Sequence, residues 1–306
     1  MDHRPNPSLP AATDIITISG DLGSGKSTVS HLLADRLGFK RYSTGDIQRD
    51  LAKARGMSSL EFNRLAEGDP SIDRLIDKGT ADLAAGNCKL IFDSRLAWHF
   101  VPVSFKVYLS VDPVVAANRI FSADRGAVER YGTVQEAITK LRERRRSEAE
   151  RFAVYYGIKV ESLRNFDLVI DSSFHEPEQI ADLIGSCFNA QEVDKLPTIH
   201  LSPKVLYPLA GEERPLQPLA LVRVAGFYYS WPEAEHQGGR TAPLPPLTEP
   251  LLSGYLAYEE GELTPSGKPI ERYVAEQCTP ELIARQEQLG GFRYPSYPPH
   301  PQRGST

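Results

Sequence analysis

The chain has 306 residues, 41% of them hydrophobic and 25% charged, so it can bury the core of one large domain or of two. Its three cysteines are widely spaced and no apolar run approaches the ~20 residues of a membrane span, which argues against a disulfide framework, a zinc site and a transmembrane helix. The formal charge of −5 gives no overall attraction for nucleic acid. We therefore expect a cytoplasmic protein that binds neither nucleic acid nor a membrane.

Residues 1–13 lack the apolar centre of a signal peptide, and we expect them to form a flexible N-terminal tail. After them the sequence predicts a buried strand, a glycine-rich loop and a helix. The β-branched run at 15–19 is typical of a strand, and residues 28–37 repeat apolar side chains at helical spacing. The loop between them, GDLGSGKS at 20–27, matches the phosphate-binding pattern G-x-x-x-x-G-K-[ST].

Such a loop holds phosphate because its glycines allow successive N–H groups to point at an anion, beside a helix N-terminus. We expect it to bind ATP, with Lys26 reaching the β- and γ-phosphates and Ser27 binding Mg²⁺. The residues expected to hold the nucleotide are Gly20, Asp21, Leu22, Gly23, Ser24, Gly25, Lys26, Ser27 and Thr28.

The next motif, STGDIQR at 43–49, follows a short segment that contains Phe39 and Tyr42 and opens a predicted helix. A helix cap alone would account for S-T-G-D. Because the motif follows a phosphate loop, we also interpret it as part of a nucleoside monophosphate site. Arg49 would bind the phosphate there, with Thr44 and Asp46 as further substrate-binding residues.

A second predicted strand, 89–92, ends in Asp93, and Arg95 follows. In a parallel sheet this strand end lies beside the phosphate loop. Asp93 could therefore fix Mg²⁺ or its waters, while Arg95 could reach the phosphate of the acceptor.

The run RERRRSEAER at 142–151 interleaves arginines with acids. A solvated helix with i,i+4 ion pairs is the ordinary interpretation. A closing lid that brings arginines to the transferring phosphoryl group is the alternative. On that alternative Arg142 and Arg144 are catalytic together with Lys26 and Arg95, and Arg151 binds substrate phosphate.

Strand-like runs at 105–110 and 168–170 continue the alternation of strands and helices, so residues 14–190 are predicted to be an α/β P-loop domain with a parallel sheet flanked by helices. After Ala190 the composition changes, and 17 of the 24 prolines lie between Pro197 and Pro301. We expect residues 191–306 to be a smaller proline-rich module of unknown function. The run VRVAGFYYSW at 222–231 indicates some β structure, and 279–290 has the caps of a helix.

The C-terminal module contains eight tyrosines, too many aromatic residues for a simple disordered linker, and it could contact a protein partner. Every candidate phosphate-binding residue precedes it. On sequence alone, a chain that ends near Ala190 is therefore expected to retain phosphoryl transfer.

Together these motifs resemble the archaeal-type (type 2) cytidylate kinases, over roughly residues 14–190. Most specific is the run GMSSLEFNRLAEGDPSID at 56–73. The resemblance implies ATP- and Mg²⁺-dependent phosphorylation of CMP or dCMP, with Arg49 and Arg95 on the acceptor phosphate and Arg142, Arg144 and Arg151 on the lid side. The matching segments are 20–28, 43–49, 54–67, 69–73, 93–97, 142–157 and 167–173.

Two departures affect the acceptor. The family usually has Glu-Gly-Arg-Leu-Ala-Gly where this chain has Asp93-Ser94-Arg95-Leu96-Ala97-Trp98, and Trp98 is expected to narrow or reshape the acceptor pocket. Lys159 stands where the family has an aspartate. Two alternatives therefore stay open: a small-molecule or modified-nucleotide kinase of a specialised pathway, and an ATP-binding regulatory or assembly protein.

Overall fold

The computed structural model describes residues 14–57, 62, 65, 70–86, 89–122, 133–190, 197–210, 219–231 and 251–298. Within α2 and α4 the side chains at 49, 50, 70–73, 75 and 76 are outside the description. The predicted N-terminal tail at 1–13 and most of the segment 58–69 lie outside the described residues.

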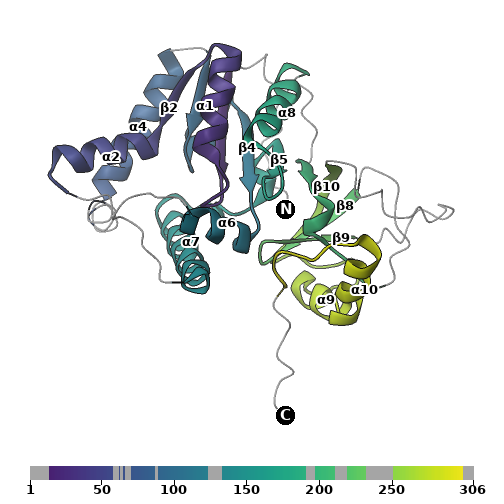
Figure 1. The fold of residues 1–306 in the computed structure, drawn as a ribbon. Helices are drawn as coiled ribbons and strands as arrows, with labels where there is room; N and C mark the ends of the chain where they lie inside the picture. Colours follow the sequence, from purple (N-terminus) through teal and green to yellow (C-terminus); the bar gives the residue numbers. More distant parts are fainter. Residues whose placement is uncertain are drawn as a thin grey trace.

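The strands of the described chain form one sheet in the order β2-β3-β1-β4-β5-β6-β10-β8-β9-β7 (Figure 1). All pairings from β2 to β6 are parallel, as predicted for a P-loop fold. The strands are β1 (Ile15–Gly20), β2 (Lys40–Ser43), β3 (Leu90–Asp93), β4 (Phe105–Ser110), β5 (Leu168–Asp171), β6 (Thr198–Leu201), β7 (Leu206–Tyr207), β8 (Leu219–Val224), β9 (Phe227–Ser230) and β10 (Leu252–Glu259).

Strand β1 lies at the centre of the parallel half, between β3 and β4. Its residues pair in register with those of both neighbours, with Ile18 opposite both Asp93 and Val107. The carboxyl ends of β1, β3, β4 and β5 therefore meet at one edge, which is where ligands bind in sheets of this kind. The four predicted strands of residues 14–190 are confirmed, while β2 is an additional one.

Helices cover both faces of the sheet (Figure 1). On one face α1 and α8 pack against β1 and β4, and Leu33 and Ile184 meet Ile18 and Leu109 in the core. The helices are α1 (Lys26–Leu37), α2 (Thr44–Ala54), α4 (Pro70–Gly86), α5 (Ala97–Phe100), α6 (Pro113–Ser122), α7 (Val134–Tyr156), α8 (Pro177–Ala190), α9 (Ile270–Gln277) and α10 (Pro280–Gly290).

Local signals explain where the helices begin and end. The Ser43 hydroxyl accepts a hydrogen bond from the backbone N–H of Asp46 (3.2 Å), so the predicted S-T-G-D cap is confirmed for α2. Thr133 caps α7 in the same way, and α7 ends at Gly157 with φ of 68°. Thr279 and Gly291 bracket α10, close to the predicted 279–290.

The run at 222–231 forms two strands, where the sequence suggested one strand-rich segment. Ala225 and Gly226, with φ of 51° and 85°, make a two-residue turn between β8 and β9. Helices α9 and α10 pack on this hairpin, and Val222 and Tyr229 join Ile270 and Ile283 in a core of their own. Figure 1 shows this C-terminal part in green and yellow, at the opposite end of the molecule from α2 and α4.

The described residues of 14–190 and those of 197–298, called here the C-terminal half, share a sheet and a buried cluster. Strand β6 pairs with β5 in parallel, and β10 pairs with β6 in antiparallel orientation. Ile199 and Leu221 from the C-terminal half pack with Trp98, Tyr108 and Val169 from the first half. The described residues contain no helix that is both long and apolar enough to cross a bilayer.

Candidate active site

The phosphate loop leaves β1 in a conformation that requires glycine. Gly20 has φ of 148°, and a Cβ atom there would lie 2.2 Å from the carbonyl oxygen of Leu109. Gly25, with φ of 82°, is the left-handed residue at the N-terminus of α1. The loop therefore brings the free N–H groups at the start of α1 to the carboxyl edge of the sheet, which is the arrangement that binds phosphate.

Lys26 folds back over this loop. Its Nζ atom donates to the carbonyl oxygens of Gly20 (2.9 Å) and Asp21 (3.1 Å). Burial, with the nearby positive charges of Arg95 and Arg144, lowers the pKa of Lys26 to about 8, although Asp93 and Asp21 oppose the shift. A buried ammonium beside two guanidinium groups is strongly stabilised when an anion binds next to it.

Ser27 and Asp93, predicted as the Mg²⁺ residues, lie together. The Ser27 hydroxyl donates to Oδ2 of Asp93 at 2.9 Å, across the gap between α1 and the end of β3. A hydroxyl beside a carboxylate is the donor set that a nucleotide-bound Mg²⁺ uses, since this ion keeps most of its waters and takes only one or two protein ligands. The described residues contain no group of three or more His, Cys, Asp or Glu side chains that could hold a metal ion.

Arg41 also belongs to this site, although the sequence analysis did not select it. From β2 its guanidinium donates to Asp93 (2.6 Å), Asp46 (2.7 Å) and the hydroxyl of Ser30 (2.7 Å), and its side chain is only 10% exposed. The sequence feature that could have identified Arg41 is its place in the short segment between the helix after the phosphate loop and the S-T-G-D motif. Arg41 thus ties the predicted acceptor helix α2 to the Mg²⁺ residue Asp93.

Arg144 and Arg151 both lie close enough to Arg95 to repel its charge. Arg95 and Arg144 both pair with Glu148, the latter at 3.2 Å. Burial, together with repulsion from Arg144 and Arg151, lowers the pKa of Arg95 to about 9. Nε of Arg151 is buried and has no hydrogen-bond partner within the described chain. The cluster holds more positive charge than Glu148 can neutralise, so it favours a bound anion.

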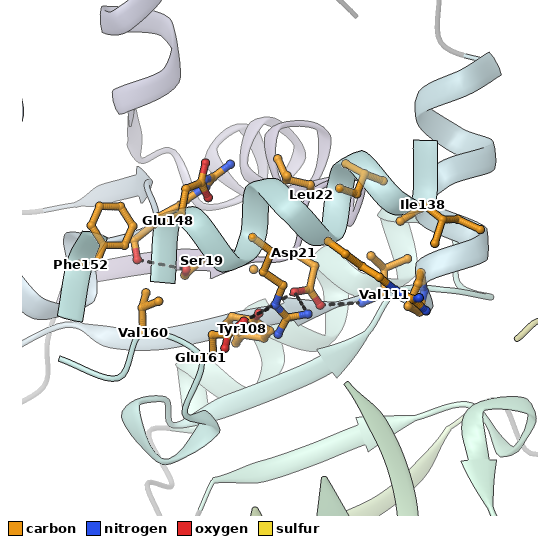
Figure 2. A pocket seen from close by; sticks show the side chains of 17 residues that line it. Ser19, Asp21, Leu22, Tyr108, Val111, Ile138, Glu148, Phe152, Val160 and Glu161 are labelled. Atoms are coloured by element: carbon orange, nitrogen blue, oxygen red, sulfur yellow. Dashed lines mark hydrogen bonds and ion pairs between the residues drawn. The ribbon is translucent and has the colours of Figure 1, made fainter. Parts of the chain in front are cut away.

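Helix α7 carries the arginine-rich run over the loop, and a cavity of about 100 Å³ lies beneath it (Figure 2). Arg142, predicted to be catalytic, is exposed and lines this cavity, as do Leu22 and Arg95. Arg146, on the outer side of α7, forms an exposed i,i+4 pair with Glu150, as the solvated-helix interpretation predicts, while the role of a lid stays a prediction. Other lining residues are Ser19, Val111, Ala116, Ile138, Phe152 and Val160.

Asp21 and Arg145 form an ion pair in the cavity that the sequence analysis did not foresee. Nη1 of Arg145 lies 3.0 Å from Oδ1 of Asp21, which also accepts from the Tyr108 hydroxyl (2.8 Å). Burial would raise the pKa of Asp21, but Arg145 and Arg223 outweigh it and hold that pKa below its usual value. Figure 2 shows the Asp21 side chain between Tyr108 and Val111, and the backbone N–H of Val111 donates to its Oδ2. These contacts hold the Asp21 side chain in a fixed position within the loop.

The remaining predicted residues are placed as follows. Gly23 and Ser24 lie in the loop, and the Ser24 hydroxyl is buried without a hydrogen-bond partner among the described residues. Thr28 is exposed on the first turn of α1. Thr44 begins α2, and of Arg49 the structure describes only its position on that helix.

Trp98 does not narrow the cavity. Its ring is buried against Phe166 and Tyr108 in the core, and its Nε1 donates to the carbonyl oxygen of Arg95 at 2.9 Å. The side chain points into the sheet face that the C-terminal half covers, and a reshaped acceptor pocket stays a prediction. Lys159, the second departure, donates to the carbonyl oxygen of Glu260 (2.7 Å) and so binds the C-terminal half.

The sequence model that describes the cytidylate kinase-like family matches residues 15–174 of this chain. The chain belongs to this family. Cytidylate kinases of Natronomonas pharaonis, Haloarcula marismortui and Sulfolobus acidocaldarius are 38%, 39% and 40% identical to it over 182, 168 and 171 residues. These alignments cover 59%, 54% and 55% of this chain and 92%, 84% and 91% of the three relatives.

A member of the cytidylate kinase-like family is a nucleoside monophosphate kinase-type phosphotransferase, and its relatives imply ATP as the phosphate donor. Among solved structures, shikimate kinase of Bacteroides thetaiotaomicron matches 57% of this chain and 98% of its own with a TM-score of 0.43 and 13% identity, which adds nothing to the argument from sequence. The family match ends before β6, so the C-terminal half is an addition to the kinase-like part.

Proposed function

We propose that this chain transfers the γ-phosphate of ATP to CMP or dCMP, giving ADP and CDP or dCDP. One observation carries the proposal. Lys26 and Arg95 are buried beside the phosphate loop, with Arg144 close to both of them and Arg151 close to Arg95, and burial together with this repulsion lowers the pKa values of Lys26 and Arg95. Such a cluster suits a reaction in which donor and acceptor phosphates meet and negative charge spreads over the transferring group. A protein that only sensed ATP would not need Arg95 or Arg151.

On the donor side the loop would hold the ATP phosphates through its N–H groups, and Lys26 would move from the carbonyl oxygens of Gly20 and Asp21 to the β- and γ-phosphates. Ser27 and Asp93 fit Mg²⁺, which when bound would neutralise charge on the phosphates. Arg41 already contacts Asp93, so we propose that it orients this carboxylate. The proposed nucleotide-binding set is Gly20, Asp21, Leu22, Gly23, Ser24, Gly25, Lys26, Ser27 and Thr28, with Asp21 acting as the anchor of the loop.

On the acceptor side Arg95 would bind the monophosphate, since it lies at the carboxyl end of β3 between the loop and α7. Arg49 and Asp46 on α2, with Thr44, would complete this side. Arg144 and Arg151 would approach the transferring phosphoryl group from α7, and Arg142 would follow from the rim of the cavity. Charge-assisted arginine contacts suit phosphate because two N–H groups can bind two oxygens at once.

The test is an acceptor panel. The full chain is incubated with ATP, Mg²⁺ and CMP, dCMP, UMP, dTMP, AMP or GMP, and formation of ADP and of the diphosphate is followed. We expect CMP or dCMP to have the highest kcat/KM. Arg95→Ala is expected to lower acceptor affinity by at least ~1.5 kcal/mol through the lost charge-assisted bond. Arg36→Ala is the matched control, because Arg36 lies on the far side of α1 in a surface pair with Asp182.

Other results would favour the alternatives left open by the sequence. Turnover with uncharged nucleosides or other small molecules, and none with any monophosphate, would indicate a small-molecule kinase. ATP binding without transfer to any acceptor would indicate a regulatory or assembly role. A cytoplasmic location, the absence of nucleic-acid binding and a protein partner for residues 191–306 stay predictions, as does the division of the chain at residue 190.

A further inference from the structure

One buried cation from the C-terminal half lies against Tyr108, whose hydroxyl binds Asp21 of the phosphate loop. Arg223, on β8, is only 6% exposed. Its guanidinium carbon lies 5.9 Å from the ring centres of Tyr108 and Tyr228, and its Nη1 donates to the carbonyl oxygen of Glu161 (3.1 Å). Nε has no hydrogen-bond partner within the described chain. A fully buried guanidinium with so few partners is costly unless its charge is used.

Arg223 closes a ring of contacts around Asp21. Tyr108 lies against Arg223 through its ring and donates its hydroxyl to Asp21. Arg145 binds Asp21 at 3.0 Å and Glu161 at 2.5 Å, and the backbone of Glu161 accepts from Arg223. Tyr108 and Arg145, the two side chains that contact the Asp21 carboxylate, are thus both linked to Arg223. Tyr108 contacts it directly, and Arg145 is linked to it through Glu161.

Within this ring the charges balance when Arg223 is counted, and Lys26 and Arg95 also lie close enough to interact with the charge of Asp21. Asp21 and Glu161 carry two negative charges, and Arg145 is shared between them. Glu161 is 41% exposed, so water screens part of its charge, whereas the side chain of Asp21 is 10% exposed. Without Arg223, this ring would hold two carboxylates and a single cation beside a loop that binds phosphates. That excess of negative charge would repel the nucleotide.

We propose that Arg223 is a positioning residue, supplied by the C-terminal half, that neutralises the buried Asp21 carboxylate and thereby allows the phosphate loop to bind a nucleotide. The proposal rests on the proposed function of this loop as the ATP site. It gives residues 219–230 a part in nucleotide binding although they lie outside the family match. The effect of Arg223 passes through Asp21, so the two residues must be coupled energetically.

The test is a double-mutant cycle on the full-length chain, with MgADP as the probe and calorimetric titration as the measurement. The variants are Arg223→Met, Arg223→Lys, Asp21→Asn and the double variant. Arg164→Met is the matched control, because Arg164 also joins the two halves, through Glu262 and the carbonyl oxygen of Ala257, without reaching Asp21. Thermal unfolding of each variant shows how much folded protein is present.

Arg223→Met is expected to weaken MgADP binding roughly tenfold, the effect of one unpaired charge near the phosphates. Arg223→Lys keeps the charge and is expected to stay within about threefold of the natural protein. In the Asp21→Asn background, Arg223→Met should change affinity by less than about twofold, because no carboxylate is left to compensate. Arg164→Met should likewise change affinity by less than about twofold.

An Arg223→Met loss that is equally large in the natural protein and in the Asp21→Asn background would overturn the inference, as would a loss on Arg164→Met as large as that on Arg223→Met. The acceptor panel separates this failure from that of the proposed function. If the double-mutant cycle shows coupling between Arg223 and Asp21 but no acceptor is phosphorylated, only the proposed function is refuted. If a monophosphate is phosphorylated but the cycle shows no coupling between Arg223 and Asp21, only the inference about Arg223 is refuted.

Discussion

The indole Nε1 of Trp98 donates a hydrogen bond to the carbonyl oxygen of Arg95 at 2.9 Å. The Ser19 hydroxyl donates to the same oxygen at 3.2 Å. These two bonds fix the backbone of Arg95 between β1 and α5. Because the Trp98 ring is itself held by Phe166 in the buried cluster shared with the C-terminal half, that cluster sets the position of the residue proposed to bind the acceptor.

Trp98→Phe should keep an aromatic ring in the cluster but lose the bond to Arg95. We expect the free energy of unfolding to fall by about 1–2 kcal/mol, from one hydrogen bond and a small loss of packing. KM for the acceptor should rise while KM for ATP stays unchanged, since Lys26 and the loop do not contact Trp98. Urea unfolding and steady-state kinetics check this prediction. An equal rise in both KM values would contradict a specific effect on Arg95.

Lys26→Ala should abolish phosphoryl transfer and leave the protein folded. The Lys26 ammonium contacts two loop carbonyl oxygens and packs against no core residue, so its removal costs little stability. Turnover with ATP and thermal unfolding are the measurements. Lys40→Ala, at an exposed site on β2, is the control. Turnover close to that of the natural protein would refute the phosphotransferase proposal.

Nucleotide affinity should depend on pH above neutrality. In the free protein the pKa of Lys26 is lowered to about 8 and that of Arg95 to about 9. A bound polyphosphate favours their charged forms and raises both pKa values, so affinity is constant below about pH 8 and falls as pH rises through 8 and 9. Calorimetric titration with MgADP from about pH 6.5 to about pH 9.5 brackets both pKa values and measures the fall. In Lys26→Ala the decrease in MgADP affinity that begins near pH 8 should disappear.

Asp171, at the end of β5, makes stability depend on pH with the opposite sign to a paired carboxylate. Burial raises its pKa from 3.8 to about 7, although hydrogen bonds from Ser173 oppose the shift. The folded state therefore keeps a proton that the unfolded state loses, and the contribution of Asp171 to stability is lost as pH rises from 3.8 to about 7, at up to about 1.4 kcal/mol per pH unit. Urea unfolding of Asp171→Asn should show a larger gain over the natural protein at about pH 8 than at about pH 5. Equal differences at both pH values would contradict the shift.

A chain that ends at Ala190 should fold poorly, contrary to the expectation from sequence alone. Truncation removes β6 from the edge of β5 and uncovers Tyr108, Val169 and Phe166, which pack against Ile199 and Leu221. It also removes Glu259, whose carboxylate accepts from the backbone N–H of Leu163 (3.1 Å). Gel filtration and circular dichroism check this. A monomeric fragment that unfolds cooperatively and binds MgADP as tightly as the full chain would contradict the prediction.

The sequence by itself determined the parts of the molecule whose physics is local. Glycines with positive φ, a lysine and a serine at fixed spacing, and a capped helix at Ser43 need only neighbouring residues to take their conformation. Strand β1 and the end of β3 could also be predicted, because buried parallel strands are short apolar runs. The proximity of Ser27 and Asp93 then followed from the rule that parallel strands end at one edge.

Only the tertiary structure decided how charges separated in the sequence neutralise one another. Arg41, Arg145 and Arg223 look like ordinary surface arginines in the sequence, yet each lies against a carboxylate or an aromatic ring from a different strand or loop. The direction of the Trp98 ring and the joining of β6 to β5 depended likewise on which face the C-terminal half covers. Burial and long-range pairing arise when distant segments pack, and no local pattern of residues encodes them.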